Sequence, residues 1–165
     1  MAMKAATVLA SVVLTLDQAS KFVVVHLMEL DRLGAIDVAP PWLNLRMAWN
    51  RGVNFGLFAD DAEIMRWALV ALSLAISAGV WIWAARAGQG RAARLFAGLL
   101  VGGALGNVLD RMVYGAVADF LNMGWPGFDN PWSFNVADVA IFLGAAGLVL
   151  MPGRHDPAPG PRRGR

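Results

Sequence analysis

The chain contains no cysteine and only two histidines among its 165 residues. It can therefore form neither a disulfide nor a thiolate metal site, and it has no thiol nucleophile. The two histidines, His26 and His155, are too far apart in the sequence to suggest a shared set of metal ligands. No internal repeat is evident.

Charged residues are also scarce, at 16% of the chain against 58% hydrophobic residues. A soluble domain of this length needs a more charged surface, so the composition predicts a polytopic membrane protein. The formal net charge is only +2, and the basic residues gather at particular segment ends. This distribution does not indicate binding to nucleic acid.

Four apolar segments predict membrane-spanning helices at residues 4–28, 64–85, 95–118 and 134–151. The first resembles a cleaved signal peptide, but Asp17 stands where a small residue should precede Ala19, and the apolar run resumes after Lys21. We therefore expect an all-α polytopic fold with one membrane domain over residues 1–152. The proline- and arginine-rich tail, 153–165, is expected to be disordered.

The polar segment 29–60 predicts a small β element between the first two spans. Apolar and polar residues alternate from Trp42 to Asn50, which is typical of a half-buried strand. Asn50-Arg51-Gly52 is a turn signal, and residues 53–58 could return as a second strand. The apolar face of this element could rest on lipid or form the wall of a substrate groove.

The basic residues predict the orientation of the chain in the membrane. Lys4, the Arg86–Arg94 loop and the tail fall on one side of a four-span bundle, which the positive-inside rule assigns to the cytoplasm. Both termini are then cytoplasmic. The β element and the loop 121–133, which carries three large aromatic residues, lie outside.

Glycines recur every four residues in the third predicted span, at Gly98, Gly102 and Gly106. Such stripes of small residues let membrane helices approach closely, so helix packing is their main expected role.

The intramembrane charges fall in one layer of the predicted bundle. At about 1.5 Å per residue, Asp17 lies about 20 Å beyond Lys4 and Asp110 about 24 Å beyond Arg94. Asp138 is about one turn inside the fourth span. Asp119 reaches the same outer interface if the third helix continues that far. On such a helix, Asp119 is about half a rotation from Asp110 and should have a different role.

Two of these carboxylates, Asp119 and Asp138, have no basic residue within four positions. Asn135 is one turn from Asp138 and could hold it. Two carboxylates in a partly desolvated site do not both ionise easily, so we expect the pair to keep a proton at neutral pH. It could activate water and protonate a leaving amine, or it could bind a cation or relay protons. The residue types leave peptide hydrolysis and ion transport open.

The other polar residues in the layer favour structural or orienting roles. Asp17 and Lys21 are four residues apart on one helical face, where they can neutralise each other, either structurally or catalytically. Asp110 beside Arg111 is expected to be structural or orienting.

Five motifs occur in a fixed order along the chain: Leu16-Asp17-Gln18-Ala19-Ser20-Lys21, Asn50-Arg51-Gly52-Val53-Asn54-Phe55-Gly56, Gly103-Ala104-Leu105-Gly106-Asn107-Val108-Leu109-Asp110-Arg111, Val117-Ala118-Asp119-Phe120 and Phe134-Asn135-Val136-Ala137-Asp138. With four predicted spans, this series closely resembles the bacterial lipoprotein signal peptidase family (signal peptidase II). The resemblance covers roughly residues 10–150.

The resemblance implies a four-helix intramembrane aspartic endopeptidase with a periplasmic β-cradle in the bacterial inner membrane. It would remove the signal peptide from diacylglyceryl-modified prolipoproteins, cutting just before the lipidated cysteine. The catalytic pair carries over to Asp119 and Asp138, with no metal or other cofactor. Dyad-orienting or substrate-contacting roles carry over to Asn107, Arg111, Asn135, Asn50 and Gly52, and structural roles to Asp17, Lys21 and Asp110. The expected partners are prolipoproteins, membrane lipids and globomycin-type inhibitors, and a monomer is expected.

Two other functions compete with a peptidase. A proton- or cation-coupled transporter could use Asp17, Asp110, Asp119 and Asp138 as a relay, but a relay should distribute carboxylates through the membrane depth. A non-catalytic membrane scaffold would use the glycine stripe and leave the unpaired aspartates unexplained.

Overall fold

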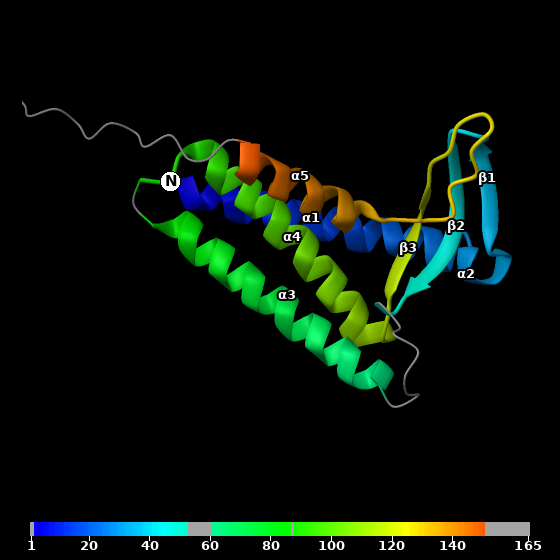
Figure 1. The fold of residues 1–165 in the computed structure, drawn as a ribbon, viewed down its shortest axis with the longest axis horizontal. Coiled ribbons are helices and arrows are strands. Elements are labelled where there is room, and N and C mark those ends of the chain that lie inside the picture. The colour runs from blue at the N-terminus through cyan, green and yellow to red at the C-terminus, as the bar shows by residue number, and fades with distance from the viewer. Residues whose placement is uncertain (1, 53–60, 87, 151–165) are drawn as a thin grey trace, which may run out of the picture.

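The computed structural model describes residues 2–52, 61–86 and 88–150, and it shows a helix bundle with a small sheet at one end (Figure 1). The long helices are α1 (Ala2–Lys21), α3 (Asp61–Ala85), α4 (Arg91–Tyr114) and α5 (Val136–Leu150). A π-helix, η1 (Phe22–Leu27), continues α1 toward the sheet. The N-terminus lies at the end of the bundle opposite the sheet.

Within the described residues, three helical stretches are long and apolar enough to cross a membrane: Met3–Leu27, Glu63–Ala85 and Arg91–Tyr114. They match the first three predicted spans, although the third begins and ends four residues earlier than expected. The fourth helix, α5, is apolar but has 15 residues, which corresponds to about 22 Å.

Helix α4 is the centre of the bundle, with α1 and α5 packed closely against it. A Cβ atom on Gly98 would lie 2.6 Å from the carbonyl oxygen of Ala6, and one on Gly102 would lie 2.6 Å from that of Ala10. On the α5 side, a Cβ on Gly144 would lie 2.6 Å from the backbone nitrogen of Leu100. The predicted packing role of the glycine stripe is therefore confirmed, because the backbones are too close for side chains.

The sheet has three antiparallel strands in the order β1 (Ala35–Ala39), β2 (Leu43–Asn50), β3 (Val117–Asn122). The predicted strand at 42–50 is confirmed as β2. The sequence did not predict β1 or β3 as its neighbours, and the possible return strand at 53–58 lies outside the described residues. The register of β2 against β3 shifts between Leu45 and Ala48, where a bulge interrupts the ladder.

The prediction that the third helix extends to residue 118 is wrong. Helix α4 ends at Tyr114, because Gly115 adopts a left-handed conformation (φ 76°) and its N–H donates to the carbonyl of Arg111. The chain then reverses into β3, which places Asp119 on a strand beside β2. Asp119 and Asp110 therefore do not lie half a rotation apart on one helix, as predicted, but on a strand and a helix.

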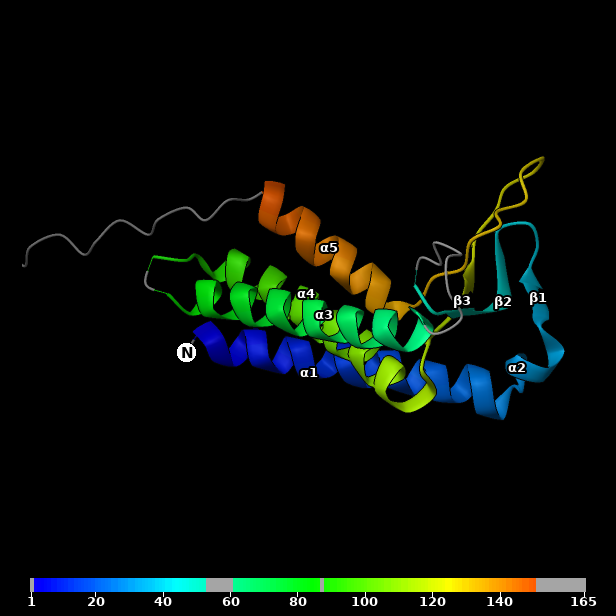
Figure 2. The same ribbon diagram turned by 60° about the horizontal axis from the view of Figure 1, so that its bottom comes forward.

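An apolar cluster fixes the sheet to the end of the first span. Leu45 from β2 and Phe120 from β3 are buried against Val24 of η1 and Leu30 of the short helix α2 (Leu30–Leu33). Figure 2 shows η1 and α2 running directly into the sheet. Burying these side chains holds β3 in a defined place above the bundle.

Candidate active site

The two unpaired aspartates meet at the junction of the sheet and the bundle, with Asn135 between them. Asp119 is buried in the middle of β3, and Asp138 lies in the first turn of α5. Asn135 donates its side-chain Nδ2 to Asp119 Oδ1 at 2.6 Å and its backbone N–H to Asp138 Oδ2 at 3.2 Å. One fully buried residue therefore holds both carboxylates.

Two further asparagines complete the set of donors. Asn107 of α4 donates to Asp138 Oδ1 at 2.9 Å, and Asn50 at the end of β2 donates to Asp119 Oδ2 at 3.1 Å. All four carboxylate oxygens of the pair accept one hydrogen bond each. Neutral amide and N–H donors fix both side chains, and no cation of the described residues forms an ion pair with either carboxylate.

The same residues begin helix α5. The backbone N–H of Asp138 donates to Asn135 Oδ1 at 2.9 Å, while the N–H of Asn135 donates back to the Asp138 carboxylate. This reciprocal cap satisfies two N–H groups and puts a carboxylate at the positive end of the helix. The expectation that Asn135 holds Asp138 is confirmed.

A buried ion cluster lies behind the pair. Lys21 Nζ is 2.8 Å from Asp17 and 2.7 Å from Asp110, and all three side chains are at most 6% exposed. The expected Asp17–Lys21 pair is present. Asp110, which the sequence associated with its neighbour Arg111, instead contacts Lys21.

Each carboxylate of this cluster also fixes the backbone beside one aspartate of the pair. Asp17 Oδ1 accepts the N–H of Ala137 at 3.0 Å, and Asp110 Oδ2 accepts the N–H of Ala118 at 3.1 Å. These are the residues immediately before Asp138 and Asp119. The ion cluster therefore connects α1 and α4 to both elements that carry the pair.

Arg111 lies beside the pair and is partly buried. Its Nη1 donates to the carbonyl of Asn107 at 3.3 Å, while its Nε is buried with no hydrogen-bond partner among the described residues. Arg66 of α3 donates to the carbonyls of Arg111 and Met112, which ties the end of α4 to α3.

A groove of about 620 Å³ opens beside Asp119. Its walls come from β2, from the loop before α5, and from Arg111 and Leu69 of the bundle. Gly52 also lines it, at φ 96°, and donates its N–H to Asn50 Oδ1 at 2.9 Å. That bond orients Asn50 so that its Nδ2 faces Asp119.

Burial raises the pKa of Asp119 to about 6, and the nearby Asp138 carboxylate adds to the effect. Hydrogen bonds from Asn50 and Asn135 favour the ionised form but do not offset these causes. The direction of this shift is the one expected for a pair of carboxylates that shares a proton.

The geometry brings together most of the residues named from the sequence: Asp119, Asp138, Asn107, Asn135, Asn50, Gly52 and Arg111. Among the described residues, no group of three or more His, Asp or Glu side chains could hold a metal ion. What remains is a carboxylate pair, one member of which readily holds a proton, beside an open groove. Such a pair can act as base and acid on water and an amide.

Two residues that support the site, Gln18 and Arg66, were not predicted from the sequence. Gln18 donates to Asp17 at 3.1 Å and to Asp110 at 2.9 Å, and its place between Asp17 and Lys21 in a polar motif was the available signal. Arg66 is the second of these residues, and nothing in its local sequence shows that it contacts α4.

The fold and the site define a membrane-embedded helical protein with a hydrolase-like pair of carboxylates at one end of its bundle. The model of the signal peptidase II family matches residues 9–152. The chain therefore belongs to the signal peptidase II family, and it is a peptidase by that membership.

Individual relatives agree with this assignment. The chain is 45% identical over 140 residues to a lipoprotein signal peptidase of Methylorubrum extorquens, covering 83% of this chain and 78% of that one. It is 37% identical to a lipoprotein signal peptidase of Nitrobacter hamburgensis over 94% of this chain and 96% of the relative. A solved bacterial membrane enzyme, 25% identical, matches with a TM-score of 0.75 over 89% of this chain and 91% of its own.

Proposed function

We propose that the protein is an intramembrane aspartic endopeptidase that removes signal peptides from diacylglyceryl-modified prolipoproteins, cutting before the lipidated cysteine. Family membership supports the reaction and the substrate class. The observation that carries the aspartic mechanism is Asn135, whose side chain and backbone hold Asp119 and Asp138 in one site.

In this mechanism, Asp119 holds the proton of the pair and Asp138 is ionised. Burial and the nearby Asp138 carboxylate raise the pKa of Asp119 to about 6, so Asp119 holds a proton more readily than an ordinary aspartate, and the helix N-terminus favours negative charge at position 138. Asp138 accepts a proton from a water molecule as the water oxygen bonds to the scissile carbonyl carbon, and Asp119 donates its proton to the carbonyl oxygen. As the C–N bond breaks, Asp138 donates its proton to the leaving amine, and the hydroxyl formed from the carbonyl returns its proton to Asp119 as the C=O double bond re-forms, which restores the starting pair.

Arg111 and the asparagines position the pair and the peptide in this proposal. Arg111 lines the groove and is partly exposed, so its guanidinium can donate to a substrate carbonyl there. Asn107, Asn135 and Asn50 hold the carboxylates, and Gly52 holds Asn50. Asp17, Lys21 and Asp110 position the backbones of β3 and α5.

For the membrane arrangement, we propose four spans, with α5 as the short fourth span and both termini in the cytoplasm. The site then lies near the periplasmic face of the bacterial inner membrane, where a lipid-anchored substrate would present its scissile bond. The sheet at the end opposite the N-terminus supports this orientation. We expect a monomer that contacts membrane lipids and binds globomycin-type inhibitors between the aspartates.

The test is cleavage of a diacylglyceryl-modified prolipoprotein in detergent, followed by gel shift. Wild type should cleave, whereas Asp119→Asn and Asp138→Asn should each lose at least about a thousandfold in rate, because neither amide can exchange the proton. Asp31→Asn, an exposed carboxylate on α2, is the matched control and should cleave normally. Activity retained in either dyad variant, with normal purification, would reject the pair as the catalytic unit of the peptidase.

A further inference from the structure

One wall of the groove beside Asp119 is made by a loop rather than by a strand or a helix. Pro131, Trp132 and Ser133 of this loop line the groove together with Asp119 itself. A peptide that reaches Asp119 through this groove therefore passes the loop wall. The position of this wall consequently affects how tightly the peptide binds.

A backbone ladder does not hold this wall. Pro131 has no N–H group to donate. In the part of the chain that the structure describes, no backbone–backbone hydrogen bond involves residues 130–133. Side chains or water must then satisfy the polar backbone groups of the segment, and only side chains can fix its position.

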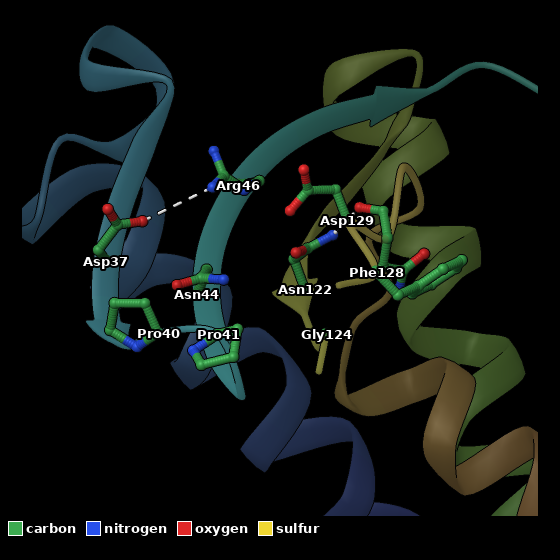
Figure 3. Close-up of a pocket in the computed structure, with 10 residues that line it drawn as sticks. Asp37, Pro40, Pro41, Asn44, Arg46, Asn122, Gly124, Phe128 and Asp129 are labelled. Atoms are coloured by element: carbon green, nitrogen blue, oxygen red, sulfur yellow. Dashed lines mark hydrogen bonds and ion pairs between the residues drawn. The ribbon is translucent and has the colours of Figure 1, made fainter. Parts of the chain in front are cut away.

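One buried side chain supplies two of these hydrogen bonds. Asn122 is the last residue of β3, the strand that carries Asp119, and only 3% of its surface is exposed. Its Nδ2 donates to the carbonyl oxygen of Asn130 at 2.8 Å and to that of Trp132 at 2.9 Å. Figure 3 shows the side chain of Asn122 directed from β3 toward this loop. Asn122 therefore joins the wall to the strand of the catalytic pair.

Two further side chains of the loop complete the attachment. Asn130 donates its Nδ2 to the carbonyl of Met123 at 3.0 Å and accepts the N–H of Trp132 at 3.0 Å. Ser133 Oγ donates to the carbonyl of Arg46 on β2 at 2.8 Å. Asn130 is partly exposed, whereas Asn122 is buried, so Asn122 is the better protected of the two asparagine contacts.

The attachment of the wall is separate from the hydrogen bonds of the pair. Asp119 accepts its side-chain hydrogen bonds from Asn50 and Asn135. Phe134 lies between the wall and Asn135, and it is held by its own backbone bonds with Leu121, at 2.8 and 2.9 Å. Loosening the wall should therefore leave the carboxylates in place.

We propose that Asn122 is a positioning residue of the peptidase, which holds Pro131 and Trp132 where they contact the substrate peptide beside the scissile bond. This role rests on the proposed function. Without Asn122, the wall becomes ordered only when the peptide binds, and that ordering weakens binding. The proton transfers at Asp119 and Asp138 continue, because no hydrogen bond of the pair is removed.

The test measures kcat and KM for a diacylglyceryl-modified prolipoprotein in detergent. Asn122→Leu keeps a similar volume but has no donor. Its KM should rise about three- to tenfold, the size of one or two neutral hydrogen bonds, while kcat stays within about twofold of wild type. The pH dependence of kcat should not change, since the carboxylates keep their surroundings.

Asn44→Leu is the matched control. Asn44 pairs with Asn122 across the sheet and is also buried, but among the described residues its side chain makes no hydrogen bond to the loop. The same substitution there should leave KM unchanged. A rise in KM as large in Asn44→Leu as in Asn122→Leu would overturn the positioning role, because any disturbance of the sheet would then suffice.

A second variant tests the wall from its exposed side. Asn130→Ala removes the contacts of a partly exposed side chain, so it should fold even if Asn122→Leu does not, and it should also raise KM with kcat retained. An unchanged KM in Asn130→Ala and in any folded Asn122→Leu, or a loss confined to kcat, would overturn the proposal and leave the peptidase function intact. Failure of wild type to cleave the prolipoprotein would instead reject the proposed function.

Discussion

The raised pKa of Asp119 makes the stability of the folded protein depend on pH. The pKa rises from 3.8 to about 6 on folding, so ionising Asp119 costs about 3 kcal/mol more in the folded state than in the unfolded state. Below pH 3.8 the Asp119 carboxyl is neutral in both the folded and the unfolded state, and it does not destabilise the fold. Between pH 3.8 and about 6 the folded state binds more protons than the unfolded state, so the free energy of unfolding falls as the pH rises. Above about pH 6 the full loss is present.

The variant Asp119→Asn removes this titration. For a chain of this length, about 3 kcal/mol corresponds to about 6–12 °C in the apparent Tm. The difference between the Tm of Asp119→Asn and that of wild type should therefore become more positive by this amount between pH 4 and pH 8. The amide also places an N–H₂ group near donors from Asn50 or Asn135, which adds an offset that does not depend on pH.

The assay is thermal unfolding in detergent, followed by fluorescence of the seven tryptophans at each pH. Carboxylates other than Asp138, which is coupled to Asp119, titrate equally in both proteins and cancel in the difference. Asp138→Asn is a graded control, because it removes the smaller cause of the shift and leaves burial in place. Its pH dependence should be reduced but not abolished. Parallel Tm curves for wild type and Asp119→Asn would refute the reasoning.

Two further predictions concern the packing around the site. Lys21→Met leaves the buried carboxylates of Asp17 and Asp110 without a cation. We expect the free energy of unfolding to fall by about 3–5 kcal/mol, measured by denaturant titration. An unchanged free energy of unfolding would mean that these ion pairs do not stabilise the fold. Gly102→Ala places a methyl group against the Ala10 carbonyl and should cost about 1–3 kcal/mol, whereas Gly79→Ala on α3, where the added Cβ meets no atom within 4 Å, should be neutral or stabilising. Similar melting temperatures for the two alanine variants would contradict the close packing of α1 on α4.

The sequence predicted those features that depend on local composition and periodicity. Apolar runs located α1, α3 and α4 to within a few residues, and alternation located β2, because burial in lipid or against a core leaves its period in the sequence. The stripe from Gly98 to Gly106 predicted where two backbones meet. The spacing of Asn135 and Asp138 gave the cap of α5. Gly115, which ends α4, is itself a helix-end signal in the sequence.

Tertiary structure decided how the polar residues are connected. Asp119 lies on a strand because Gly115 ends α4 and β2, about 70 residues earlier, supplies the strand's hydrogen-bond partners. Lys21 contacts Asp110 across 89 positions of sequence, which no helical spacing encodes. Hydrogen bonds and ion pairs depend on distances of about 3 Å, and only the packing of α1, α4, α5 and the sheet around one another brings such distant residues that close.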